Sequence, residues 1–128
     1  MAAILIVDDD QTVRDTLYDL LCDEHLCHAA ETAEQALAWL AEDEDFYDIV
    51  ITDISMPGMS GVELLGHVRQ RQPRTSVIIV TGISDEGHAQ GLLRLGAYAY
   101  VLKPFKLEQV ESIVEGALAE SDERPEEG

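Results

Sequence analysis

Short, unbroken apolar runs constrain the fold of this sequence more than any other feature. They read AILIV at Ala3–Val7, IVI at Ile49–Ile51, VIIV at Val77–Val80 and AYVL at Ala99–Leu102. A strand with one solvent-exposed face alternates apolar and polar residues. A continuous apolar run therefore predicts a strand that is buried on both faces. Strands of this kind belong to parallel sheets, in which helices pack on each side.

Helical patterns separate these runs and complete the picture. Apolar residues recur at helical spacing after the strands, at Val13, Leu17, Leu20 and Leu21, at Ala33, Ala36, Leu37 and Leu40, at Val62, Leu65 and Val68, and at Leu107, Val110, Val114, Ala117 and Leu118. A weak strand over Cys27–Ala30 and a helix over about 85–95, with Gly96 as its C-cap, fill the gaps. Five strands alternating with five helices predict a doubly wound α/β fold, since the crossovers must be right-handed.

Length and composition bound the organisation of the chain. The 128 residues suit one domain, which we predict over residues 1–120, followed by an acidic tail or the beginning of a linker over 121–128. No apolar run approaches the roughly 20 residues that a membrane span needs. The first residues lack the basic region of a secretory signal, so we expect a cytoplasmic protein.

The net charge of −18, from 26 acidic and 8 basic residues, limits the partners. Such a surface repels nucleic acid phosphates, so we do not expect this chain to bind DNA or RNA directly. A cation is a more natural partner.

The polar residues that matter most follow the strands directly. Asp8-Asp9-Asp10 follows the first strand, Thr52-Asp53 the third, Thr81 the fourth and Lys103-Pro104 the fifth. In doubly wound sheets, ligands bind beside the carboxyl ends of the strands. We therefore expect a cluster of carboxylates, one hydroxyl and one lysine at one edge of the sheet.

The chemistry of that cluster is coherent. Neighbouring carboxylates repel and require a cation, and oxygen ligands at an open site suit Mg²⁺. Asp53 can then act as a nucleophile and form an aspartyl phosphate, with Lys103 and the Thr81 hydroxyl holding phosphoryl oxygens. A carboxylate is ionised at neutral pH, which explains why no base lies beside it in the sequence.

Four stretches, in this order and each at a strand end, carry a family resemblance. They are ILIVDDD, IVITDISMPGMSG, VIIVTG and AYVLKPF. Over residues 3–118 the chain resembles a response regulator receiver domain of two-component phosphorelays, similar to the chemotaxis receivers. The resemblance implies a flavodoxin-like three-layer sandwich whose parallel sheet has the strand order 2-1-3-4-5.

The resemblance also implies roles for particular residues. Asp8, Asp9, Asp53 and the main-chain carbonyl of Ser55 would hold Mg²⁺, while Asp53 takes phosphate from a sensor histidine kinase or a phosphotransfer protein. Thr81 and Tyr100 resemble the switch pair of the family, and Lys103 its phosphate-binding lysine, usually followed by a cis-proline, here Pro104. Such a protein is a switch rather than an enzyme. Its fourth helix, fifth strand and fifth helix would form the surface for an output domain or a dimer partner.

Other interpretations stay open from the residues. Asp10 is more simply the N-cap of the first helix than a metal ligand. Cys22, His25, Cys27 and His28 suggest zinc, but Cys27 and His28 should point to opposite faces of a strand.

Two other function classes compete. A phosphatase of the haloacid dehalogenase type also uses a strand-end Asp with Mg²⁺, although Ser55 stands where its second Asp is expected. A flavodoxin-like binding module would need a phosphate cradle that the first turn lacks.

Overall fold

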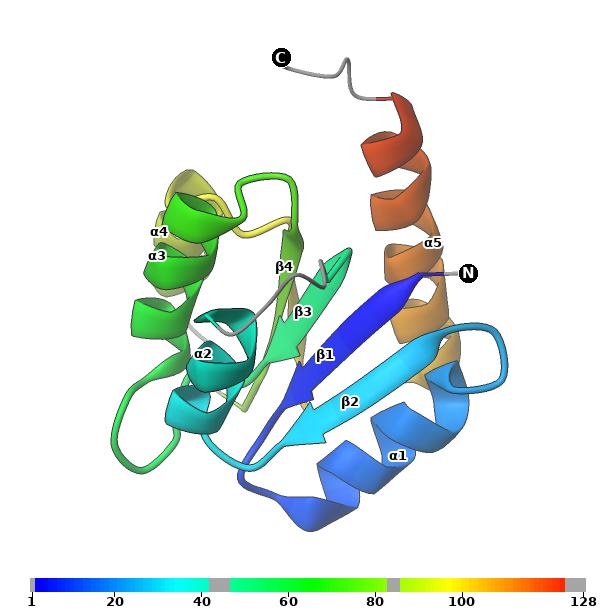
Figure 1. Ribbon diagram of the computed structural model, residues 1–128, viewed down its shortest axis with the longest axis horizontal. Coiled ribbons are helices and arrows are strands. Elements are labelled where there is room, and N and C mark those ends of the chain that lie inside the picture. The colour runs from blue at the N-terminus through cyan, green and yellow to red at the C-terminus, as the bar shows by residue number, and fades with distance from the viewer. Residues whose placement is uncertain (1, 42–46, 83–85, 124–128) are drawn as a thin grey trace.

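The computed structural model describes residues 2–41, 47–82 and 86–123, and strands and helices alternate through these ranges (Figure 1). The elements are β1 (Ala3–Val7), α1 (Gln11–Leu21), β2 (Leu26–Ala30), α2 (Ala33–Ala41), β3 (Ile49–Thr52), α3 (Gly61–Arg71), β4 (Ser76–Thr81), α4 (Glu86–Arg94), β5 (Ala99–Leu102) and α5 (Leu107–Glu123). None of the described helices is both long and apolar enough to cross a membrane.

The strands form one parallel sheet in the order β2-β1-β3-β4-β5. β1 pairs with β2 on one side and with β3 on the other, so that Ile6 lies opposite both Ala29 and Ile51. This order confirms the predicted doubly wound, flavodoxin-like fold. It also places the carboxyl ends of β1 and β3 side by side at the centre of the sheet.

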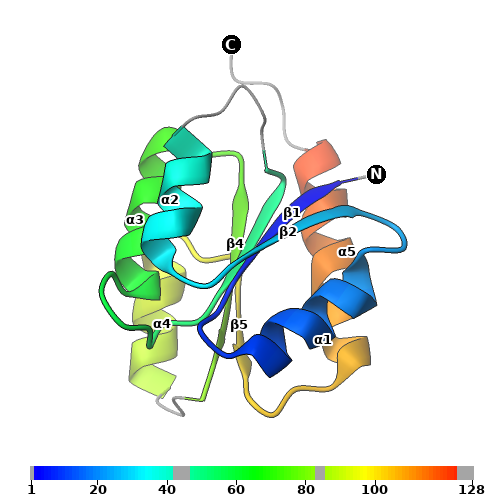
Figure 2. The ribbon, with the colours of Figure 1, turned by 60° about the horizontal axis from the view of Figure 1, so that its bottom comes forward.

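Helices cover both faces of the sheet, as Figure 2 shows: α1 and α5 lie on one side, and α2, α3 and α4 on the other. Successive side chains of β1 therefore enter different cores. Ile4 and Ile6 pack with Leu17 of α1 and Val114 of α5. Leu5 and Val7 pack in a second core, with residues of α2 and α3 that include Ala36, Leu40, Leu64 and Leu65. Each fully buried aliphatic side chain contributes about 1.5–3 kcal/mol of hydrophobic stabilisation.

The helix ends that face the predicted site are capped by short polar side chains. Asp10 accepts a hydrogen bond from the Thr12 amide at 2.8 Å, which confirms it as the N-cap of α1. Ser60 caps α3 by accepting from the Glu63 amide at 3.2 Å. These side chains satisfy amides that would otherwise lack partners in the first helical turn.

The C-terminal end of α4 is capped by main-chain hydrogen bonds instead. Gly96 has a φ of +110°, and the Gly96 and Ala97 amides donate to the Leu93 and Leu92 carbonyls, each at 3.1 Å. This is a Schellman motif, and it confirms Gly96 as the predicted terminator.

The predicted element bounds differ from the structure mainly at the end of the chain. We expected the domain to end at residue 120, but α5 extends to Glu123. The remainder of the predicted tail, 124–128, lies outside the described residues, as does residue 85 at the expected start of the fourth helix.

Candidate functional site

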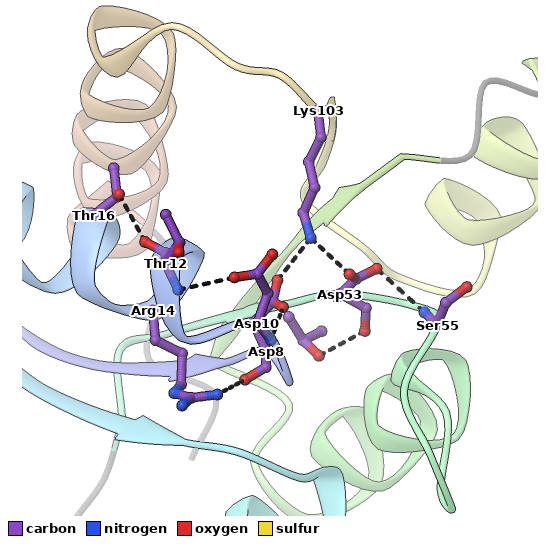
Figure 3. Close-up of polar contacts among 9 residues, drawn as sticks. Asp8, Asp10, Thr12, Arg14, Thr16, Asp53, Ser55 and Lys103 are labelled. Atoms are coloured by element: carbon purple, nitrogen blue, oxygen red, sulfur yellow. Dashed lines mark hydrogen bonds and ion pairs between the residues drawn. The ribbon is translucent and has the colours of Figure 1, made fainter.

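One ammonium group joins the ends of two neighbouring strands. Lys103, directly after β5, donates to Asp8 Oδ2 at 2.9 Å and to Asp53 Oδ2 at 2.7 Å (Figure 3). Asp8 follows β1 and Asp53 follows β3, so the parallel register brings both carboxylates to the same edge. Both carboxylates are buried, with residue exposures of 2% and 7%.

A third carboxylate completes the cluster. Ligand atoms of Asp8, Asp9 and Asp53 all lie within 4.8 Å of one another, and Asp9 is exposed to solvent. Three carboxylates at this spacing repel one another, and a bound cation would relieve that repulsion. Their oxygen atoms and the open side at Asp9 fit Mg²⁺, which prefers oxygen ligands and keeps several waters.

Burial and neighbouring charges shift the pKa values of Asp8 and Lys103 in opposite directions. Burial raises the pKa of Asp8 above its ordinary value, although the Asp10 amide and Lys103 favour the charged form. Burial also tends to lower the pKa of Lys103, but its bonds to Asp53 and Asp8 outweigh this and raise it. Lys103 is therefore charged at neutral pH, while an ionised Asp8 costs folding free energy.

The loop after β3 holds Asp53 tightly. The Ser55 amide donates to Asp53 Oδ1 at 3.2 Å, so the two carboxylate oxygens have different partners. A Cβ on Gly61 would clash with the Asp53 carbonyl oxygen. Only glycine therefore allows α3 to begin directly against the backbone of Asp53.

The remaining predicted residues lie on the α4 side of the same edge. Thr81 ends β4 and is buried, and Tyr100 on β5 is partly buried against the core that contains Ile79. In the β4–β5 register, Tyr100 pairs with Ile79 and Leu102 with Thr81, so Thr81 and Tyr100 occupy neighbouring strands. The Lys103–Pro104 peptide bond is cis.

Sequence reasoning missed Arg14. Its Nη1 donates to the main-chain carbonyl oxygen of Asp8 at 2.6 Å, and its Nη2 lies 3.8 Å from Glu31 Oε1. An arginine on an amphipathic helix is ordinarily read as part of the solvated face. The one available signal was its position four residues after Asp10, on the helix that follows the acidic end of the first strand.

The zinc interpretation does not fit the geometry. Cys27 is buried, His28 is exposed, and neither Cys22 nor Cys27 forms a disulfide. Burial raises the pKa of the Cys27 thiol to about 11, which opposes the thiolate form that binds metals. Within the described ranges, the carboxylate cluster is the one group of potential metal ligands that converges.

Comparisons with known proteins agree on one family. A family profile described as "Response regulator receiver domain" matches residues 4–115. The chain is 40% identical over 106 residues to "Response regulator protein FleR" of Pseudomonas aeruginosa, which covers 82% of this chain and 22% of that protein. It is 36% identical over 122 residues to "DNA-binding transcriptional regulator NtrC" of Salmonella typhimurium, covering 94% and 26%. The chain thus spans about a quarter of these relatives.

Solved structures give the same picture. A response regulator receiver domain protein from Clostridium thermocellum superposes with a TM-score of 0.88 at 29% identity, over 95% of this chain and 98% of that one. The structure titled "BeF3 Activated DrrB Receiver Domain" superposes with a TM-score of 0.85 at 29% identity, over 93% and 98%.

The raised pKa of Asp8 predicts a stability effect. Since the folded-state pKa is above the ordinary 3.8, the contribution of Asp8 to stability is present below pH 3.8 and is lost as pH rises through the folded-state pKa. Asp8→Asn should therefore raise the urea midpoint at pH 7 without Mg²⁺. The advantage over wild type should shrink on acidification. A variant less stable than wild type at pH 7 would show that the Lys103 bond outweighs the burial cost.

Proposed function

This chain belongs to the response regulator receiver domain family, and on that premise we propose that Asp53 is its phosphoacceptor. As a receiver domain it is a component of two-component phosphorelays. The observation that carries the assignment is the position of Asp53 among the ends of β1, β3 and β5, with Lys103 Nζ 2.7 Å from its Oδ2. Asp8 contacts the same ammonium group, but Asp8 lies in the turn that leads to Asp10, the N-cap of α1. We therefore do not assign Asp8 as the acceptor.

The transfer follows from what these side chains can do. An oxygen of the Asp53 carboxylate attacks the phosphorus of the donor, a P–O bond forms, and the bond from phosphorus to the leaving group breaks in line with it. The leaving group is an imidazole when the donor is a phosphohistidine. Lys103 exchanges its bond to Asp53 Oδ2 for one to a phosphoryl oxygen, and the Thr81 hydroxyl donates to another.

Mg²⁺ fits the donor set of the site. Asp8, Asp9, Asp53 and the main-chain carbonyl of Ser55 would hold it, and the bound ion would neutralise charge on the transferring phosphoryl group. The tight β3–α3 loop supports this ligand set, because the Ser55 amide already bonds Asp53 Oδ1 and fixes the start of the loop.

The chain acts on its own side chain, and we propose that it is a switch rather than an enzyme. Its relatives are named as regulators. The phosphatase alternative has no support, because that chemistry needs an acid two residues after the nucleophile and Ser55 stands there. A flavin-binding module is disfavoured by the same carboxylate cluster.

We propose a cytoplasmic protein whose phosphoryl donor is a sensor histidine kinase or a phosphotransfer protein. Since NtrC is named as DNA-binding and is about four times as long as the matched region, an output domain is a natural partner. The charge of −18 argues against direct nucleic acid binding by this chain. An acidic tail or the beginning of a linker over 121–128 stays a proposal, and its first residues, 121–123, continue α5.

We also propose that α4, β5 and α5 form the partner or dimer surface. Four leucine side chains are exposed there: Leu93 of α4, Leu95 directly after it, Leu102 of β5 and Leu107 of α5. Exposed apolar side chains on adjacent elements indicate an interaction surface. Thr81 and Tyr100 lie beside it, so a change at Asp53 can reach it through β4 and β5.

The first prediction from this proposal concerns the acceptor. Asp53→Asn should abolish phosphorylation by a phosphoramidate donor with Mg²⁺, measured as the mass increase of the intact protein, because the nucleophilic oxygen is lost. Removal of Mg²⁺ by a chelator should do the same to wild type. Asp10→Asn is the matched control, since asparagine is an equally good N-cap and labelling should persist. Wild-type labelling of Asp53→Asn would refute the assignment.

The second concerns the surface. Beryllofluoride, a phosphoryl mimic, should slow amide exchange in α4 by about tenfold or more, equivalent to about 1.4 kcal/mol of local stability. Leu92 is the one described residue of α4 that is fully buried, so this helix is held mainly by its C-terminal end. Residues 13–21 of α1 should change little. A response confined to α1 would place the output surface elsewhere.

A further inference from the structure

We propose that Arg14 is a positioning residue for Mg²⁺ binding, which acts by fixing the main chain of Asp8. The inference rests on the proposed function, because it assumes that Asp8 is a metal ligand. Arg14 contacts the Asp8 carbonyl and Glu31 rather than the carboxylates of Asp9 or Asp53. Its contact is with the backbone that carries Asp8 (Figure 3).

The carbonyl of Asp8 lies just beyond the sheet. β1 ends at Val7, whose carbonyl accepts from the Asp53 amide at 3.1 Å, and the Asp8 amide still donates to Ala30 at 3.2 Å. The Asp8 carbonyl is the first group of this strand to leave the ladder. A buried carbonyl needs a partner, and Arg14 Nη1 supplies one at 2.6 Å.

This bond anchors the main chain from which the Asp8 carboxylate projects. Asp8 Oδ1 accepts from the Asp10 amide at 2.9 Å and Oδ2 from Lys103, so the side chain is fixed by the turn that follows it. Arg14 spans this turn, because its side chain extends from α1 to the main-chain carbonyl of Asp8. Without the bridge, the Asp8–Asp10 turn keeps its local bonds but loses its attachment to α1 at this carbonyl.

The surroundings of Arg14 fit a structural tether. Its side chain is only 13% exposed, and its second guanidinium nitrogen faces Glu31 in the β2–α2 connection. The Glu31 amide in turn donates to Gln35 Oε1 at 3.0 Å. The Glu31 side chain is 74% exposed, so this pair contributes little energy, but it orients the guanidinium group.

Arginine can influence a cation site in two opposed ways. Its positive charge repels Mg²⁺, so removing the charge alone should tighten Mg²⁺ binding. Its bond to Asp8 orders a ligand, so removing the bond should weaken binding. The direction of the change therefore distinguishes positioning from a simple charge effect.

The test is calorimetric titration of the full chain with MgCl₂. Arg14→Gln removes both the charge and the forked donor, and it should raise the Mg²⁺ Kd by about tenfold, the lower end of what supporting residues of metal sites contribute. Arg14→Lys keeps the charge but cannot reach the carbonyl and Glu31 together, so it should also bind more weakly than wild type. Arg71→Gln is the matched control: it removes an exposed charge at the far end of α3 and should leave the Kd unchanged.

A second measurement does not involve the metal. Amide exchange of residues 9 and 10 in the Mg²⁺-free protein should be faster in Arg14→Gln than in Arg71→Gln, while the urea midpoint reports any general loss of stability. An Mg²⁺ Kd in Arg14→Gln equal to or tighter than that of wild type would overturn the inference. If wild type itself binds no Mg²⁺, the proposed function fails as well, so the two failures are distinguishable.

Discussion

Two buried carboxylates that share one ammonium group are the interaction on which the site depends. Asp8 and Asp53 come from adjacent strands, and Lys103 reaches both from the end of β5. Two buried carboxylates then face one ammonium group, so negative charge exceeds positive charge. This excess costs folding free energy unless a further cation binds. Under the proposed function, the same imbalance that costs folding free energy would favour Mg²⁺ binding. Lys103 would then exchange a carboxylate oxygen for a phosphoryl oxygen.

The fold makes this imbalance possible by keeping each carboxylate in place from more than one direction. The parallel register aligns the ends of β1 and β3. Gly61 lies against the Asp53 carbonyl in the β3–α3 loop, and Arg14 ties Asp8 to α1. By contrast, α4 is anchored chiefly through Leu92 and its Schellman motif. The carboxylate cluster is thus held by more contacts than the neighbouring helix α4, and this difference fits the switch that we propose.

The strands and the carboxylate cluster could be predicted from the sequence because both follow from local patterns. Unbroken apolar runs give buried strands, and polar residues directly after them must meet at one edge of a parallel sheet. The extension of α5 to Glu123 could not be predicted in this way, because the apolar stripe ends at Leu118 and the remaining turns are polar. Arg14 was missed because its burial depends on the approach of the Asp8 carbonyl and the β2–α2 connection, which no helical periodicity reveals.

The central claim is that phosphate is carried by Asp53, and chemical mapping of the phosphorylated protein tests it most directly. Borohydride reduces an aspartyl phosphate to the corresponding alcohol, so the modified residue becomes homoserine and can be located by peptide mass spectrometry. After treatment with a phosphoramidate donor and Mg²⁺, the account predicts homoserine at position 53. Homoserine at position 8 or 9 instead, or a phosphorylated protein that resists borohydride, would contradict it.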